Sequence, residues 1–137
     1  MTVLIYVLIG LNGLLNVGNG LYMLADPATW YVIVPTVTGT GPFNQHFIRD
    51  IGISHLLVGI GYLWGIAAPA QRVWMWAAAT IWLTVHGIFH LWEIAVGICG
   101  TDVIAQNWHA VYLPAAIGLL GVIWAYVDPA TAKKACA

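Results

Sequence analysis

Four long apolar stretches are the feature of this 137-residue sequence that most constrains its fold. They cover approximately residues 3–24, 45–68, 73–98 and 108–127. Each is long enough for a membrane-spanning helix, which needs about 20 residues. The breaks between them carry residues that end helices: Asp26-Pro27, Pro69, Gly100 and Asp128-Pro129. The pattern predicts an all-α integral membrane protein, a four-helix bundle that forms one domain over residues 1–137. Pro114, inside the fourth stretch, predicts a kink there.

The scarcity of charge supports the membrane prediction. The chain has four Lys or Arg and five Asp or Glu, so 7% of its residues are charged, and 61% are hydrophobic. Soluble domains carry about a quarter charged residues. So few charges cannot cover a water-exposed surface or form a basic patch, which excludes a soluble monomer, a disordered chain and a nucleic-acid-binding protein.

The basic residues predict the orientation in the bilayer. Arg72 lies in the second connection, and Lys133 and Lys134 lie in the C-terminal tail. Because Lys and Arg favour the cytoplasmic side, both termini are expected in the cytoplasm, with the first and third connections on the periplasmic side of a bacterial inner membrane. Cys99 and Cys136 then fall on opposite sides, so no disulfide is expected between them.

The segment between the first two predicted spans, residues 26–44, is too short to cross the bilayer and too apolar for an ordinary loop. One interpretation is an interfacial segment or a short β-hairpin on the outer surface. The other is a lid over a site in the mouth of the bundle.

Several polar residues fall inside the predicted spans, where an ionisable side chain costs at least about 2–3 kcal/mol and usually marks function. The charged ones are Arg49, Asp50 and Glu93. All five histidines lie nearby in sequence or in depth: His46, His55, His86, His90 and His109. Counting about 1.5 Å per helical residue puts all of these residues in the outer half of the bundle. Asn12, Asn16 and Asn19 lie at the same levels on the first span.

Helical spacing predicts which of these residues share a face. His86, His90 and Glu93 have the spacing i, i+4, i+7, which confines them to an arc of about 60°. Asn12, Asn16 and Asn19 repeat that spacing. His46 and Asp50 share a face of the second span, with Arg49 at its edge. His55 lies about 180° from His46, so the two cannot both point to one centre in a straight helix.

The leading hypothesis is a transition-metal site, with copper or iron first and zinc as a further candidate. The core ligands would be His86, His90 and Glu93, and the ligands completing one or two sites would be His46, Asp50 and His109. The pocket or second-shell residues would be His55, Arg49, Asn12, Asn16 and Asn19. Such a site would serve redox chemistry, as in a metal-dependent membrane oxidoreductase, or metal handling.

Other functions are compatible with the same residues. His55 and His86 lie at matching depth and could bind haem, a weaker hypothesis because haem would not need the carboxylates. The chain could also be a haem- or quinone-binding accessory subunit of a larger membrane redox complex, a small oligomeric transporter, or a proton or ion pathway. The polar residues could instead form only a structural network. Gly61 and Gly65 would pack the bundle or form a homo-oligomer interface.

Two motifs resemble those of a group of small bacterial four-span membrane proteins. These proteins read approximately N-x-H-F-x-R-D-x-G and H-x3-H-L-W-D/E. The matching segments here are residues 44–52, NQHFIRDIG, and residues 86–93, HGIFHLWE. The resemblance covers the second and third predicted spans. It implies a four-helix membrane fold and no particular activity.

Overall fold

A computed structural model describes residues 2–128, and these residues form helices joined by short turns. The elements are α1 (Thr2–Ala25), α2 (Pro27–Ile33), η1 (Val37–Gly39), α3 (Gln45–Ala67), η2 (Pro69–Gln71), α4 (Arg72–Ala95), α5 (Asp102–Asn107), η3 (Trp108–Tyr112) and α6 (Leu113–Val127). No strand occurs within residues 2–128, so the all-α prediction is confirmed for that range. Lys133, Lys134 and Cys136, used above for orientation and disulfide pairing, lie outside the described residues.

Three helical segments are long and apolar enough to cross a membrane. They are Thr2–Ala25, Gln45–Ala67 and the continuous run Asp102–Val127. Helix α4 does not belong to this set, although its 24 residues match the length of α1, and it carries the polar residues His86, His90 and Glu93. The fold therefore agrees with an integral membrane protein.

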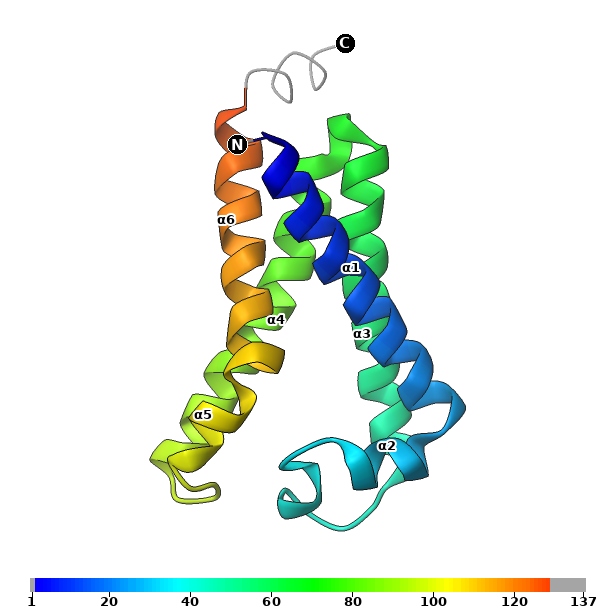
Figure 1. Ribbon diagram of the computed structural model, residues 1–137, viewed down its shortest axis with the longest axis vertical. Coiled ribbons are helices and arrows are strands. Elements are labelled where there is room, and N and C mark those ends of the chain that lie inside the picture. The colour runs from blue at the N-terminus through cyan, green and yellow to red at the C-terminus, as the bar shows by residue number, and fades with distance from the viewer. Residues whose placement is uncertain (1, 129–137) are drawn as a thin grey trace.

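The long helices form two pairs that meet at one end of the molecule. Helix α1 packs on α3, and α4 packs on α6. Figure 1 shows the pairs close together where α1 begins and α6 ends, and separated at the end that holds α2 and α5. The core side chains are Ile9, Val58, Tyr62, Trp76, Ala79, Leu83, Ala115, Trp124 and Ala125. Near the centre of this core, the hydroxyls of Tyr62 on α3 and Thr80 on α4 are hydrogen-bonded at 2.9 Å.

Glycines bring the backbones of α1 and α3 into contact. A Cβ atom at Gly59 would lie 2.6 Å from the carbonyl oxygen of Gly13, and one at Gly20 would lie 2.6 Å from the carbonyl oxygen of Gly52. Neither separation can accommodate a side chain, so close packing of this pair requires glycine at these positions.

Gly61 and Gly65 both face α4 within the same chain. A Cβ atom at Gly61 would lie 3.3 Å from the carbonyl oxygen of Met75, and one at Gly65 would contact the Trp76 ring. The first of the two sequence-based interpretations, packing within the bundle, therefore accounts for this pair, and a homo-oligomer stays a prediction.

A π-helical turn, η3, ends at Tyr112, two residues before Pro114, and the chain changes direction there (Figure 1). Pro114 lacks the N–H that a regular helix would use, and a π turn is one way to absorb that loss. The kink predicted from the sequence is thus present.

Arg72 is buried at the closed end of the bundle, with a relative exposure of 3%. Its Nε donates to the carbonyl oxygen of Gly65 at 3.1 Å, and one guanidinium nitrogen lies 3.9 Å from Asp128 Oδ2. The guanidinium carbon lies 4.9, 5.5 and 5.7 Å from the ring centroids of three aromatic residues: Tyr6, Trp76 and Trp124. Arg72, the first residue of α4, therefore contacts α1, α3 and α6 through one guanidinium group.

Replacing Arg72 by methionine is expected to lower the melting temperature in detergent by several degrees. Desolvated cation–π contacts are worth about 2 kcal/mol, and the hydrogen bond to Gly65 is lost as well. The melting temperature of Arg72→Lys should fall between those of the wild type and Arg72→Met, because lysine keeps the charge but not the planar stacking. Equal melting temperatures for wild type and Arg72→Met would contradict this role.

The segment at residues 26–44 is helical in part and does not form the β-hairpin considered above. Asp26 caps α2, since its Oδ1 accepts the N–H of Thr29 at 3.1 Å. Hydrogen bonds from the Thr29 side chain and backbone hold the pKa of the Asp26 carboxyl below its ordinary value. Trp30 Nε1 donates to Asn19 Oδ1 at 2.9 Å, which ties α2 to α1.

Candidate functional site

The three residues predicted as core metal ligands meet on one face of α4. His86 Nε2 lies 3.3 Å from His90 Nε2, and His90 Nδ1 lies 2.9 Å from Glu93 Oε2. The imidazole of His90 therefore lies between the other two groups. The face-sharing predicted from the i, i+4, i+7 spacing is present in the structure.

His55 approaches this group from α3. Its ring centroid lies 6.4 Å from that of His86. Trp82 connects the two rings, because it stacks on His86 with centroids 4.9 Å apart and meets the His55 ring edge-on at 5.0 Å. Trp82 was not anticipated from the sequence. It lies one helical turn before His86, and that spacing is the signal that could have identified it.

A line of hydrogen bonds fixes the proton on His55. Asn12 Nδ2 donates at 3.0 Å to the carbonyl oxygen of Pro114, and a carbonyl oxygen can only accept a hydrogen bond. Asn12 Oδ1 then accepts from Asn16 Nδ2 at 3.1 Å. Asn16 Oδ1 is left facing His55 Nδ1 at 2.8 Å, so Nδ1 must carry the hydrogen. This tautomer leaves a free lone pair on His55 Nε2.

Asn19 does not belong to this line. It accepts from Trp30 and contacts Met23 Sδ at 3.7 Å, so it supports α2 instead.

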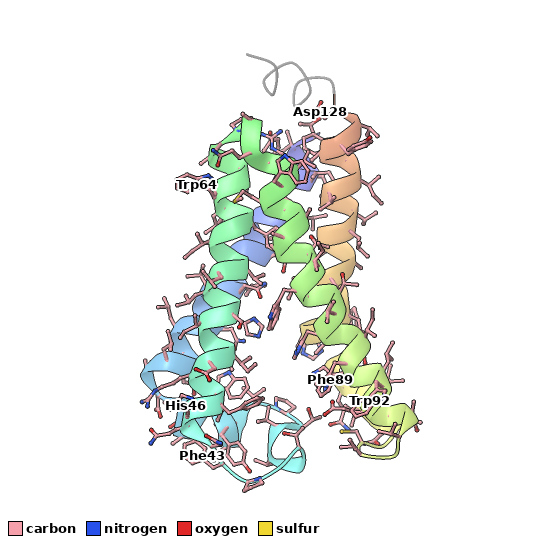
Figure 2. The ribbon with its side chains drawn as sticks, turned by 180° about the vertical axis from the view of Figure 1, so that it is seen from behind. Phe43, His46, Trp64, Phe89, Trp92 and Asp128 are labelled. Carbon is pink, nitrogen blue, oxygen red and sulfur yellow. The ribbon has the colours of Figure 1, made fainter. Side chains whose placement is uncertain are left out.

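His46, Arg49 and Asp50 lie away from the α4 cluster. His46 Nε2 and Asp50 Oδ2 are 3.3 Å apart, with side chains 87% and 56% exposed. Figure 2 shows His46 near the N-terminal end of α3, on the side away from α4. Arg49 donates to Gln45 Oε1 and to the carbonyl oxygen of Leu24. His46 lies away from the cluster because α3 begins at Gln45, before His46, which fixes His46 on the helix face opposite His55.

His109 is exposed on the η3 turn, where its only described ring contact is with Trp108 at 6.0 Å. The structure therefore does not bring the six predicted ligands together. It gathers His86, His90 and Glu93, adds His55, and leaves His46, Asp50 and His109 at the surface.

The cluster does not form a ready-made site with three converging ligands. Within residues 2–128, no group of three or more His, Cys, Asp or Glu side chains is placed to hold one metal ion. The 3.3 Å between the Nε2 atoms of His86 and His90 is nevertheless a chelating distance. Two imidazole nitrogens bound tetrahedrally at about 2.0–2.1 Å from one ion lie about 3.3–3.4 Å apart.

Glu93 is buried, with a relative exposure of 8%. Its Oε2 lies near His90 Nδ1 but has no hydrogen bond of good geometry to any described residue, and the hydroxyl of Tyr112 is likewise unsatisfied. A buried carboxyl group with so few partners is costly if it is ionised and unpaired, so this position favours a compensating positive charge nearby, such as a metal ion bound to the other nitrogen of His90.

A pocket of about 360 Å³ adjoins the cluster at the open end of the bundle. Its walls come from η1, the turn after α4, and α5, and include Thr36, Thr40, His90, Cys99, Asp102 and Asn107. The segment at residues 26–44 thus contributes one wall of a pocket that reaches His90.

Comparisons of the chain with protein-family models, curated proteins and solved structures give no match. The described residues form an all-helical fold with membrane-length helices and a cluster of three histidines, one of which, His90, contacts the buried carboxyl group of Glu93.

Proposed function

We propose that this chain is an integral membrane protein that binds a transition-metal ion between α3 and α4. The observation that carries the proposal is the 3.3 Å separation of His86 Nε2 and His90 Nε2, which suits two ligands of one ion. His55 is the third ligand, because its tautomer leaves Nε2 free on the side away from Asn16.

Glu93 has a different role in this proposal from the ligand role predicted from the sequence. It lies at the nitrogen of His90 that would not bind the ion. A carboxylate at that position orients the imidazole and increases its basicity. Asn16 does the same for His55, so two of the three ligands have a positioning partner.

Imidazole ligands favour copper, iron or zinc, and copper and iron remain first. Three protein ligands leave one position open for water or a small molecule, which redox chemistry and metal handling both need. Partnership with a second copy or with a larger redox complex stays a prediction.

We also propose α4 as the fourth span. Large apolar side chains are exposed along its outward face at Trp74, Ile81, Val85, Ile88 and Trp92, as expected of a lipid-facing surface. With both termini in the cytoplasm, the pocket would open on the periplasmic side.

The decisive experiment is metal analysis of the purified protein in detergent. We expect about one equivalent of copper, iron or zinc after reconstitution, with no Soret band in the optical spectrum. Less than about a tenth of an equivalent of any metal would reject the metal site, and a Soret band would favour haem.

A proton pathway is the second candidate, because the His90 ring contacts both His86 and Glu93 and could pass a proton between them. Proton flux into liposomes tests it. If Glu93→Gln abolishes flux while metal content stays near zero in both proteins, the pathway replaces the metal site.

Glu93→Gln also tests the positioning role directly. Loss of such a partner typically lowers metal affinity about 10- to 100-fold, and we expect a change in that range. Asp50→Asn is the matched control, since it removes an exposed carboxylate from the neighbouring helix. A titration in which both variants bind like wild type would remove Glu93 from the site.

A further inference from the structure

The pocket at the open end of the bundle has the position of an access route to the cluster. Its volume of about 360 Å³ is large enough to hold several water molecules. His90 is the member of the cluster that reaches the pocket wall. An ion that enters the pocket therefore meets His90 first.

The pocket wall has the chemistry of a cation path. Hydroxyl, amide and carboxylate oxygens come from Thr36, Thr38, Thr40, Asp102, Gln106 and Asn107. Among the described residues, no Lys or Arg lines the pocket, and Glu93 adds a second carboxylate next to His90. Oxygen-rich, net-negative walls attract cations and repel anions.

One side-chain contact joins the two sides of the pocket. Thr36 Oγ1 lies 3.1 Å from Asn107 Nδ2 and 3.2 Å from Asn107 Oδ1, across 71 residues of sequence. Thr36 has a left-handed backbone conformation, with φ of 69°. This conformation costs a β-branched residue about 1–2 kcal/mol.

We infer that this pocket is the route by which a hydrated transition-metal cation reaches His90, and that the Thr36–Asn107 contact must open to admit it. The inference rests on the proposed metal site. The tests below therefore include one that needs no metal.

The first test uses Cys99 as a native reporter in the pocket wall. In a Cys136→Ser background, a cationic methanethiosulfonate should label Cys99 about tenfold faster than an anionic one of similar size, after correction for reactivity with a free thiol. Asp102→Asn should reduce that ratio. Equal corrected rates would overturn the cation preference, whether or not a metal is bound.

The second test locks the contact. Thr36→Cys and Asn107→Cys are combined with Cys99→Ser and Cys136→Ser, and the introduced pair is oxidised. The locked protein should take up copper(I) or zinc at least about tenfold more slowly than the same protein after reduction, with equal final metal content. Equal uptake rates would overturn the gate. If neither form binds metal, the proposed function fails, and the labelling ratio alone decides on the cation route.

Discussion

Replacing His90 by alanine is expected to lower the affinity for the bound metal by more than about a hundredfold, beyond the range typical of positioning residues. The substitution removes one nitrogen of the 3.3 Å pair and leaves Glu93 buried without its closest polar side-chain neighbour. His86→Ala should have a similar effect through loss of the other nitrogen. Competition with a chromophoric chelator in detergent measures both affinities.

Matched controls come from the histidines that the structure places at the surface. His46→Ala and His109→Ala remove the same chemical group at exposed positions, and we expect metal affinity to be unchanged. If these variants lose the metal as completely as His90→Ala, the wider ligand set predicted from the sequence is correct and the smaller cluster is not the site.

Replacing Gly59 by alanine is expected to destabilise the protein strongly. The new Cβ atom would lie 2.6 Å from the carbonyl oxygen of Gly13 and 2.7 Å from the backbone nitrogen of Val17. Both are backbone atoms of α1, so relief requires the helices to separate rather than a side chain to move. Overpacking of this kind costs about 1–3 kcal/mol, and Gly59→Val should cost more. Thermal melting in detergent, followed by tryptophan fluorescence, measures the change.

Gly18 on α1 provides the control. A Cβ atom there would have no neighbour within 4 Å, and alanine is the better helix former. Gly18→Ala should therefore melt at the wild-type temperature or above it. If Gly59→Ala and Gly18→Ala melt alike, α1 and α3 are not packed through their glycines.

Sequence reasoning succeeded where one helix determines the outcome. The face shared by His86, His90 and Glu93 follows from spacing along α4 alone. The prediction of contacts between different helices was less complete, because matching depth in the membrane does not decide which face of α3 points inward.

A signal for that choice was present in the glycines of α3. At about 100° per residue, Gly59 and His55 lie within about 60° of Gly52, whereas His46 and Asp50 lie about 120° and 160° away. The glycine face packs on α1, so it identifies the inward side of the helix. Contacts such as Thr36–Asn107, which join residues 71 positions apart, had no comparable signal.

The geometry of the cluster depends on the angle between α3 and α4. The Tyr62–Thr80 hydrogen bond holds these two helices together, and His55 and His86 lie about 10 Å from it along α3 and α4, at 1.5 Å per residue. At that distance, one degree of rotation between the two helices changes the distance between the two rings by about 0.2 Å. The interhelical angle at the Tyr62–Thr80 contact therefore determines how far His55 lies from the other two imidazoles.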